Sequence, residues 1–535
     1  MASVTTVLPI ISNPPVGSIQ GARVTLVRPA MIHSAKTYSL SITPPLGLAY
    51  LAAMLLEVGH EVTAVDAMAE GKDNRRVVDG FAIVGLSIDE TVARIHPDSV
   101  VIGISCMFSQ DWTWSRQLIR AVRRRFPHAV IVAGGEHITA LPEYSLRDCR
   151  ELDACVLGEG EETLTELVRA GNDRAVWQEV PGLAFLAGEQ FVRSASRSRI
   201  REVDDIPLPA WELFPMSVYL NPWNSMGVYR GRTMGILGTR GCPYKCTFCS
   251  NLQMYGQTWV ARDVDAVLDE IQHYIDAYGA ENFEFYDLTM IIRKSWILEF
   301  CQKLDERGMK IVWQLPVGTR SETIDAEVAA ALYRTGCRNI VYAPESGSND
   351  TLKKIKKQVH LDRLVTSIGQ ALSSQLVVRV NMILGFPHET RRHLWDSVLF
   401  AWRLAWIGVH DLCVYVFSPY PGTDLFRELC ETKTIPAIDD NYFSSLVVMQ
   451  DVLTPTNYCH QVSGRELFVW RVFTTVTFYG LSFLRRPSRF FKLAWNIARN
   501  RCETTLEFRL GTILRGHQTK GAAAALPTPS VAAGS

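Results

Sequence analysis

The chain has 535 residues, of which 47% are apolar and 21% are charged, a balance typical of a globular protein. At about 100–200 residues per domain, this length predicts several domains. Basic and acidic residues number 55 each, so the zero net charge gives no reason to expect nucleic acid as a partner. Residues 1–20 lack a basic segment followed by an apolar one, so no signal peptide is expected. The twelve cysteines are therefore assigned to a reducing cytoplasm.

Residues 22–195 alternate strand-like and helix-like segments behind an N-terminal extension, residues 1–21. The apolar runs between them carry few charges, as expected for strands that are buried on both faces. The five expected strands are 23–27, 61–67, 99–107, 129–137 and 152–162. Such alternation predicts a doubly wound, Rossmann-like α/β domain with a parallel sheet.

Three of these strands end in small or polar residues, in the segments 103–110, 134–137 and 158–161. In open α/β sheets, ligands bind at the carboxyl ends of the strands, and glycine there allows a close approach of the backbone. The three turns together favour a ligand site. Tight strand–helix turns, which glycine also serves, are the alternative for any one of them.

Residues 196–229 are rich in proline and interrupt the alternation, so we expect a linker there. From 230 to 430 the alternation resumes with six further strand–helix units. They predict a partial TIM-type (β/α)6 barrel, with its chemistry at the carboxyl ends of the strands. The six expected strands are 233–241, 282–288, 310–320, 339–347, 377–387 and 411–423. A basic helical region, 431–518, and a low-complexity, disordered tail, 519–535, are expected to follow.

The segment GCPYKCTFCS, residues 241–250, places Cys242, Cys246 and Cys249 within eight residues, with no fourth cysteine nearby. Zinc fingers and ferredoxin clusters use four protein ligands. Three thiolates on such a loop leave one iron of a cubane cluster open to bind a substrate or cofactor. A zinc site completed by a distant histidine or cysteine is the alternative.

This loop resembles the cluster loop of the radical S-adenosylmethionine superfamily. Later segments resemble the barrel motifs of that family in the same order, at 283–288, 343–348, 380–390 and 418–423. The resemblance implies that the three cysteines hold three irons of a [4Fe–4S] cluster and that S-adenosylmethionine chelates the fourth.

The same resemblance implies that S-adenosylmethionine is contacted by Asp287, Glu345, Ser346 and Asn381. Two of these residues have structural alternatives. Asp287 could instead cap a helix. Glu345 could instead form an ion pair with an arginine such as Arg320 or Arg379.

The domain ahead of the barrel resembles the cobalamin-binding domain of cobalamin-dependent radical S-adenosylmethionine enzymes, through the segments 44–67, 132–143 and 156–167. The implied cobalamin contacts are Ser105, Gly134, Gly135, Glu136, Gly158 and Gly160. The histidine motif D-x-H-x-x-G is absent, because Met31 stands two residues before His33, and His137 is only a weaker ligand candidate. The resemblance therefore implies cobalamin bound without a histidine ligand, with a degenerate domain that has lost cobalamin as the alternative.

Together these features imply a cobalamin-dependent radical S-adenosylmethionine C-methyltransferase. A 5′-deoxyadenosyl radical would take hydrogen from an unactivated carbon of a small-molecule, hydrophobic or natural-product substrate, and methylcobalamin would supply the methyl group. An external electron donor of the flavodoxin or ferredoxin type is expected. We also predict that the carboxyl ends of both sheets face one shared cavity. The alternatives are an oxidative cyclase or ring-rearranging enzyme of the same family, similar to the anaerobic cyclases of porphyrin metabolism, and a non-enzymatic electron carrier.

Residues 466–500 mix aromatic side chains with arginine and lysine. Their longest uncharged run, residues 472–484, has 13 residues and is too short to span a bilayer. Helices packed on the barrel are one interpretation of this segment, and peripheral membrane contact is the other. The expected location is the cytoplasm, with or without that membrane contact.

Overall fold

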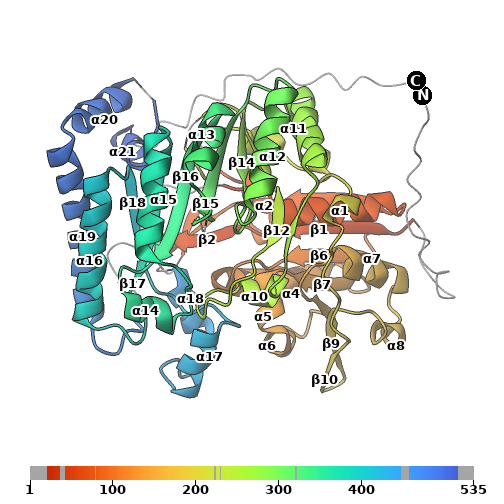
Figure 1. The fold of residues 1–535 in the computed structure, drawn as a ribbon. Helices are drawn as coiled ribbons and strands as arrows, with labels where there is room; N and C mark the ends of the chain where they lie inside the picture. The colour runs from red at the N-terminus through yellow and green to blue at the C-terminus, as the bar shows by residue number, and fades with distance from the viewer. Residues whose placement is uncertain are drawn as a thin grey trace.

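The computed structural model describes residues 21–35, 42–78, 80–221, 224–228, 230–319, 322–447, 457–499 and 501–515. The expected tail, 519–535, and all of the expected extension, 1–21, except Gly21 lie outside these ranges. Within them, an N-terminal α/β unit and an open barrel face one another; of the C-terminal helices, the one at Asp440–Val447 packs against the N-terminal unit and the later ones lie along the barrel (Figure 1).

The N-terminal unit is a seven-stranded sheet in the order β10-β9-β8-β7-β6-β1-β3. Its strands are β1 (Arg23–Arg28), β3 (Glu61–Asp66), β6 (Val101–Ser105), β7 (Val130–Gly134), β8 (Ala154–Val156), β9 (Leu183–Ala187) and β10 (Gln190–Arg193). The first five are the expected parallel strands, and β9 and β10 add an antiparallel edge. Helices α1 (Leu46–Glu57) and α7 (Glu161–Ala170) cover one face and α4 (Trp112–Arg125) the other, so the predicted doubly wound sheet is confirmed.

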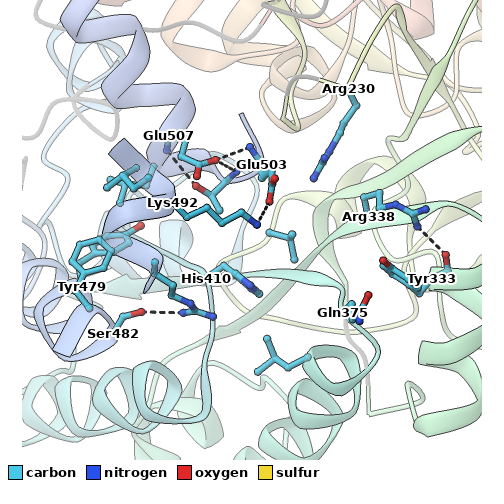
Figure 2. Close-up of a pocket in the computed structure, with 17 residues that line it drawn as sticks. Arg230, Tyr333, Arg338, Gln375, His410, Tyr479, Ser482, Lys492, Glu503 and Glu507 are labelled. Carbon is cyan, nitrogen blue, oxygen red and sulfur yellow. Dashed lines mark hydrogen bonds and ion pairs between the residues drawn. The ribbon is translucent and has the colours of Figure 1, made fainter. Parts of the chain in front are cut away.

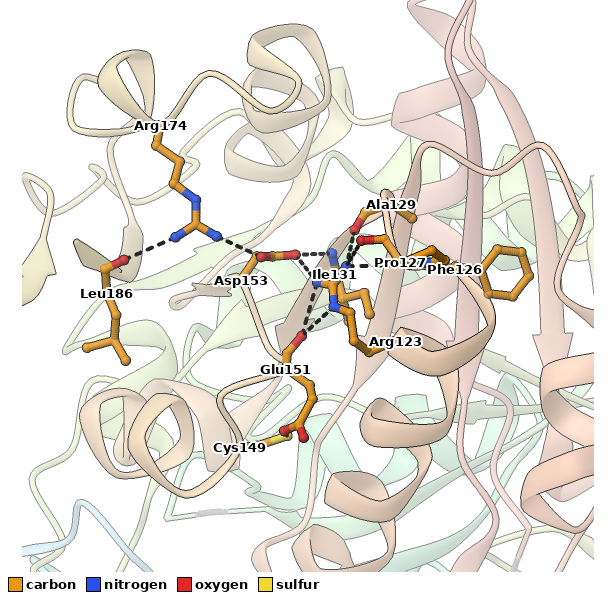
Figure 3. Close-up of polar contacts among 10 residues, drawn as sticks. All are labelled: Arg123, Phe126, Pro127, Ala129, Ile131, Cys149, Glu151, Asp153, Arg174 and Leu186. Carbon is orange, nitrogen blue, oxygen red and sulfur yellow. Dashed lines mark hydrogen bonds and ion pairs between the residues drawn. The ribbon is translucent and has the colours of Figure 1, made fainter. Parts of the chain in front are cut away.

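Asp153, directly before β8, ties this sheet to its helices at the amino ends of the strands (Figure 3). Its carboxylate accepts hydrogen bonds from the Ile131 N–H of β7 (2.8 Å) and from Arg174 (2.8 Å), and it pairs with Arg123 of α4. Arg123 also donates to the carbonyl oxygen of Glu151 (3.1 Å). A partly buried carboxylate with two guanidinium partners and a backbone donor fixes this end of the sheet, opposite the end that carries the ligand loops.

A second, three-stranded sheet was not predicted. It has the order β2-β5-β4 and is antiparallel, with β2 (Met31–Ser34), β4 (Arg75–Val78) and β5 (Phe81–Val84). Each of its strands has only four residues, which is too short for alternation to be distinguished from a loop in the sequence. The short helices of this unit are α2 (Ala67–Glu70), α3 (Ile88–Arg94), α5 (Glu136–Ala140), α6 (Pro142–Asp148) and α8 (Arg174–Trp177).

The barrel contains the six predicted strands, all parallel, in the order β11-β14-β15-β16-β17-β18. They are β11 (Thr233–Ile236), β14 (Asn282–Phe285), β15 (Val312–Thr319), β16 (Cys337–Glu345), β17 (Val377–Leu384) and β18 (Asp411–Val416). Because β11 and β18 are the two ends of this order and do not pair in the described chain, the barrel is open. Its helices are α10 (Asn251–Tyr255), α11 (Val264–Tyr278), α12 (Lys294–Glu306), α13 (Ala326–Arg334), α14 (Asn349–Lys354), α15 (Leu361–Ser373), α16 (Arg391–Ile407) and α17 (Asp424–Glu431).

The described part of the expected linker, 196–229, is packed rather than free. Tyr219 of α9 (Met216–Tyr219) accepts a hydrogen bond from Arg28 (2.6 Å) and donates one to Asp66, which holds the linker to the N-terminal sheet. At the barrel, the Gly227 N–H donates to Glu284 of β14 (2.7 Å). Burial raises the pKa of Glu284 to about 7, against the lowering effect of these donors. The linker therefore fixes how the two units face each other.

The C-terminal helices are α18 (Asp440–Val447), α19 (Gly464–Arg485), α20 (Ser488–Ala498) and α21 (Thr505–Arg515). In the described residues α19 is the one helix long and apolar enough, by length and composition alone, to cross a bilayer. The uncharged run 472–484, which by itself is too short to span a bilayer, is part of this longer helix, which continues across Arg471. Leu467, Thr474 and Phe478 form one buried side of α19, which packs along α16 and β18 as a helix of a globular protein does.

Candidate functional site

The three-cysteine loop is closed at its base by a short antiparallel pair, β12 (Thr239–Gly241) with β13 (Trp259–Ala261). Gly241 has φ +90°, and a Cβ atom there would lie 2.1 Å from the carbonyl oxygen of Thr258. Only glycine therefore fits directly before Cys242, where the loop leaves the hairpin.

Cys246 is buried, whereas Cys242 and Cys249 are partly exposed. Phe248, between the last two cysteines, packs edge-on against Phe386 with ring centres 5.6 Å apart. Burial raises the pKa of the Cys249 thiol to about 12, so in the free protein this sulfur stays protonated. Bound iron would have to stabilise the thiolate, as metal coordination does.

A single tetrahedral zinc ion would draw its sulfur ligands to within about 4 Å of each other, because each Zn–S bond is about 2.3 Å. Among the described residues, no three Cys, His, Asp or Glu side chains are gathered in that way. Three thiols within eight residues of one loop can each bind a different iron of a cluster.

Asp287, a predicted S-adenosylmethionine contact, follows β14 and points back toward the start of the loop. Its carboxylate accepts hydrogen bonds from the Gly238 N–H (3.1 Å) and the Thr239 hydroxyl (2.5 Å). Neither donor is at a helix start, so the helix-cap alternative was wrong. Burial raises the pKa of Asp287 to about 6. In this structure Asp287 holds the strand that leads into the cluster loop, and its contact with S-adenosylmethionine stays a prediction.

Glu345, at the end of β16, has φ +72°, a left-handed conformation that is strained for glutamate. Its carboxylate pairs with Lys357 at 2.9 Å. The suggested partner Arg379 donates instead to the carbonyl oxygen of Pro316 (2.7 Å), and Arg320 lies outside the described residues. An ion pair at Glu345 was thus predicted correctly, but with the wrong partner.

Lys357 was missed by sequence reasoning. Its side chain is buried, and Glu345, Cys246 and Cys249 all favour its charged form, which raises its pKa against the lowering effect of burial. A charged amine beside the cluster loop and Glu345 can receive a carboxylate. The only signal in the sequence was the basic run at 353–357, whose other lysines are exposed.

Ser346 and Asn381 occupy different surroundings. The Ser346 hydroxyl is fully buried, 3.3 Å from the Ser397 hydroxyl, and accepts a hydrogen bond from the Ser348 N–H (3.2 Å). Asn381 of β17 alternates with buried Val380 and Met382, so its side chain is on the barrel side of the strand. The Asn381 Oδ1 atom is buried and has no hydrogen-bond partner. A buried acceptor without a donor in the lumen fits a ligand such as S-adenosylmethionine.

On the opposite side, the predicted cobalamin loops lie at the carboxyl ends of β6, β7 and β8. Ser105 and Gly134 are paired neighbours at the ends of β6 and β7. Gly135 has φ +111°, and a Cβ atom there would lie 2.7 Å from the carbonyl oxygen of Cys106. Met107 and Phe108, in the same loop, are 43% and 47% exposed. Two large apolar side chains are therefore exposed at the edge of the sheet where ligands bind.

The 158–161 loop serves a second purpose that sequence reasoning missed. Glu159 and Glu161 both pair with Arg240 of β12, at 3.1 and 2.7 Å, and all three side chains are less than a tenth exposed. Arg199 of the linker also pairs with Glu159, at 2.6 Å. This buried network joins the predicted cobalamin loop to β12, whose last residue, Gly241, precedes Cys242.

The two glycines of that loop, Gly158 and Gly160, lie close to neighbouring helices of the chain. A Cβ atom at Gly160 would lie 3.2 Å from Leu51 of α1, and one at Gly158, which has φ +69°, would lie 3.5 Å from the Met254 carbonyl oxygen of α10. Both positions therefore support the loop, and their contact with cobalamin stays a prediction.

His137 is excluded as a cobalt ligand in this conformation, contrary to its weak candidacy in the sequence. It is buried and stacked on Trp112, with ring centres 4.7 Å apart. Its Nδ1 lies 3.0 Å from the Ser109 hydroxyl and its Nε2 lies 3.2 Å from the Ser145 hydroxyl. Both nitrogens are thus engaged. His33 lies on β2 of the small second sheet, not in a loop.

The predicted shared cavity is present. A pocket of about 240 Å³ is lined by Met107, Phe108, Ser109 and Glu136 of the N-terminal unit and by Ser250, Tyr420 and Pro421 of the barrel. Helix α10 packs against α5, and the Gln253 amide donates to the Gly422 carbonyl oxygen (2.7 Å). The Gly135 turn, the cluster loop and the loop after β18 therefore converge at one place. Tyr420 was not named from the sequence, although it lies in the segment that resembled the sixth-strand motif.

Comparisons with known proteins agree with both halves of this site. The B12 binding domain family matches residues 35–168, and the Radical SAM superfamily matches residues 236–401. The chain is 31% identical over 422 residues to cytidylyl-2-hydroxyethylphosphonate methyltransferase of Streptomyces wedmorensis, covering 72% of this chain and 78% of that protein. It belongs to the cobalamin-dependent radical S-adenosylmethionine enzymes.

Two further comparisons concern activity and fold. The uncharacterized methyltransferase PH0819 of Pyrococcus horikoshii is 29% identical over 405 residues, covering 76% of this chain and 82% of that protein. The structure of the radical S-adenosylmethionine methyltransferase TsrM from Kitasatospora setae, with cobalamin and a [4Fe–4S] cluster bound, has a TM-score of 0.60 at 18% identity, covering 77% of this chain and 78% of that one. The predicted enzyme class, a cobalamin-dependent radical S-adenosylmethionine methyltransferase, is confirmed, as are its three cofactors.

Proposed function

We propose that this methyltransferase acts on an unactivated carbon of a small molecule that binds in the 240 Å³ pocket between the two units. The observation that carries the proposal is the pocket's lining, with the predicted cobalamin loops on one side and the residue after Cys249 on the other. When bound, the cluster with S-adenosylmethionine supplies a hydrogen-abstracting radical, and cobalamin supplies the methyl group. The chain's own residues hold the target carbon between these two cofactors and exclude water.

Glu136 and Tyr420 are the polar groups that we assign to substrate orientation. Burial raises the pKa of Glu136 to about 7, and burial together with the nearby Glu136 raises the pKa of Tyr420. Near neutral pH the Glu136 carboxyl can therefore either donate or accept a hydrogen bond. Met107 and Phe108 supply an apolar wall, so a substrate with one polar group and an apolar body fits this pocket.

Product mass tests the reaction. A substrate that gains one CH2 per turnover supports methyl transfer, and a product with an unchanged methyl count would establish the cyclase or rearrangement alternative instead.

We expect Glu136→Gln to raise KM about ten-fold or more, because a hydrogen bond to a charged group is worth about 1.5–3 kcal/mol. The wild-type KM should also change with pH between about 6 and 8, as Glu136 titrates, and the variant should lack this dependence. Bound cobalamin, measured by its absorbance, should be unchanged. Loss of cobalamin from the variant would assign Glu136 to the cofactor, as the sequence first suggested. Glu143→Gln, on an exposed carboxylate of α6, is the matched control.

We also propose that an acidic electron donor of the flavodoxin or ferredoxin type docks beside the cluster loop. The Thr247 N–H donates to the carbonyl oxygen of Ile355 (3.0 Å), so the lysine run lies directly against this loop. Lys245, Lys353 and Lys354 are exposed there. Positive charge close to the redox centre would steer an acidic protein to it.

The variant Lys353→Glu/Lys354→Glu is expected to slow turnover with a flavodoxin by about ten-fold or more at low salt. Turnover with dithionite, which needs no docking surface, should be unchanged. The double variant Arg124→Glu/Lys310→Glu makes the same change in charge at exposed positions elsewhere. Equal losses in both double variants, or a loss with dithionite, would refute this docking surface.

Peripheral membrane contact is proposed for the surface formed by α16, α19 and α20. Leu484, Phe491 and Trp495 are exposed, and arginines flank them: Arg485 stacks on Trp406 (5.1 Å) and Arg499 on Trp495 (3.9 Å). Exposed aromatics beside basic side chains suit the interface of an anionic bilayer.

Sedimentation with anionic vesicles should fall about ten-fold or more for Phe491→Ser/Trp495→Ser, because each buried aromatic contributes about 1.5–3 kcal/mol. Val77→Ser/Val78→Ser, on exposed apolar residues of β4, should bind as the wild type does. Sedimentation of the wild type that is no greater than in buffer alone would refute membrane contact.

A further inference from the structure

A second and larger cavity, of about 490 Å³, lies at the amino ends of the barrel strands, opposite the cluster loop. It is enclosed by the starts of β16 and β17, by the residue before β18, and by α19, α20 and α21 with the segment that joins the last two (Figure 2). Nothing in the methyl-transfer chemistry uses this end of the barrel, because the carboxyl ends of the strands hold the reaction site.

The cavity lining is basic. It contains Arg230, Arg338, Arg489 and Lys492, against the two carboxylates Glu503 and Glu507. Both carboxylates are already engaged: Glu503 pairs with Lys492 at 2.6 Å, and Glu507 accepts hydrogen bonds from the N–H groups of Glu503 and Thr504. Within the described chain, none of the three guanidinium groups has a carboxylate within 4.0 Å.

The three arginines instead donate to neutral oxygens. Arg230 reaches Asn339 Oδ1 (3.0 Å), Arg338 the Tyr333 carbonyl (2.8 Å), and Arg489 the Val409 carbonyl (2.8 Å). The carbonyl oxygens that accept from Arg338 and Arg489 lie at the ends of α13 and α16. A helix end carries only about half a negative charge, which does not neutralise the full positive charge of an arginine. Each guanidinium has five N–H donors, so donors remain for a ligand.

Two further observations point to an anion. The His410 Nδ1 atom accepts a hydrogen bond from the Val378 N–H (3.1 Å), which assigns the proton of the neutral ring to Nε2 and adds another N–H donor to the lining. Burial lowers the pKa of Arg230 although Glu503 and Glu507 act to raise it, and burial with the nearby Arg486 lowers that of Arg489 to about 10 although Asp411 acts to raise it. All three carboxylates already have other hydrogen-bond or ion-pair partners, so an oxyanion would add counter-charge to these partly buried cations.

From this lining we infer that the cavity binds a phosphate-bearing ligand, with its oxygens held by basic side chains of the lining, Arg230 and Lys492 among them, and its remainder filling the space toward α19 and α20. Two sources present this group: a soluble phosphate ester, or the headgroup of an anionic phospholipid reached from the exposed aromatic surface of the same helices. The inference does not depend on the methyl acceptor, on Glu136 or on the lysines beside the cluster loop.

The test is calorimetry of the full-length protein with inorganic phosphate and with glycerol 3-phosphate, at constant ionic strength set with chloride. We expect saturable binding that weakens at least about ten-fold in Arg230→Gln, the loss of one charge-assisted contact. Lys492→Gln, at an exposed position that cannot disturb the core, should weaken binding several-fold. Arg124→Gln, which removes one exposed arginine from α4, should bind as the wild type does.

Vesicles separate the two sources. If glycerol 3-phosphate releases the protein from phosphatidylglycerol vesicles, the cavity takes the lipid headgroup. If it binds in calorimetry but does not release the protein, the ligand is a soluble ester and the vesicles are held elsewhere. No saturable binding of either phosphate to the wild type, or equal binding by the wild type, Arg230→Gln and Lys492→Gln, would overturn the inference. Circular dichroism and iron content of each variant confirm that it is folded.

Discussion

Replacing Cys246 with alanine is expected to abolish turnover, with 5′-deoxyadenosine formation reduced more than about 100-fold. Removing even an outer-shell partner of a metal ligand costs about 10–100-fold, and Cys246 is assigned as a ligand itself. With two thiolates, two irons of the cluster would lack protein ligands instead of one. The measurements are iron and sulfide content, the visible absorbance of the cluster, and 5′-deoxyadenosine formed after anaerobic reconstitution.

Cys430→Ala is the control for this variant. Cys430 lies on α17, is partly exposed, and is not part of the loop. Its removal should leave iron content and turnover unchanged. The Cys246 variant should also bind cobalamin normally, because the predicted cobalamin-binding residues lie in the N-terminal unit and not in the cluster loop. A Cys246→Ala protein with full iron content and wild-type 5′-deoxyadenosine formation would exclude this cysteine as a ligand.

Replacing Arg240 with methionine is expected to destabilise the contact between the two units by about 3–5 kcal/mol. The change would leave Glu161 buried without a cation, while Glu159 keeps Arg199. Turnover should fall together with stability, because Arg240 belongs to the strand that ends at the cluster loop. Chemical denaturation followed by tryptophan fluorescence measures the loss, and a separate early transition would show that the two units have come apart.

A double-mutant cycle identifies the buried charge as the cause. Adding Glu161→Gln to Arg240→Met should recover part of the stability, because a neutral amide is less costly to bury than a carboxylate. Arg147→Gln breaks an exposed ion pair with Glu143 and should cost less than about 1 kcal/mol. If Arg240→Met were as mild as Arg147→Gln, the network would not be what holds the units together.

Much of the fold could be predicted because its signals are local. All five parallel strands of the first sheet and all six of the barrel are apolar runs bounded by helices of ordinary length, and each was found. The small sheet of β2, β4 and β5 was not found, because four-residue strands give no readable period and their pairing joins segments about 50 residues apart. Helix α19 is longer than the uncharged run counted in the sequence, because a helix continues through arginine when one side of it is buried.

The residues of the candidate site also fall into those that the sequence could predict and those that it could not. The three cysteines, Glu345 and Asn381 could be named because they stand in motifs whose order along the chain is distinctive. Lys357 and Tyr420 could not be named from the sequence. A lysine in a basic run and a tyrosine in a loop are most often ordinary surface residues. Their importance comes from neighbours that are distant in sequence or in another domain.

The sequence by itself determined the chemistry: three thiols on one short loop, and two series of strands that alternate with helices. These are properties of short segments, and short segments set local conformation and ligand type. The tertiary structure decided which groups face each other. It placed Glu136 and Tyr420 in one pocket, joined Glu159 and Glu161 to Arg240, and gathered four basic side chains and two carboxylates around a cavity at the far end of the barrel. Charges and cavities depend on distances across the folded chain, and neither composition nor spacing fixes those distances.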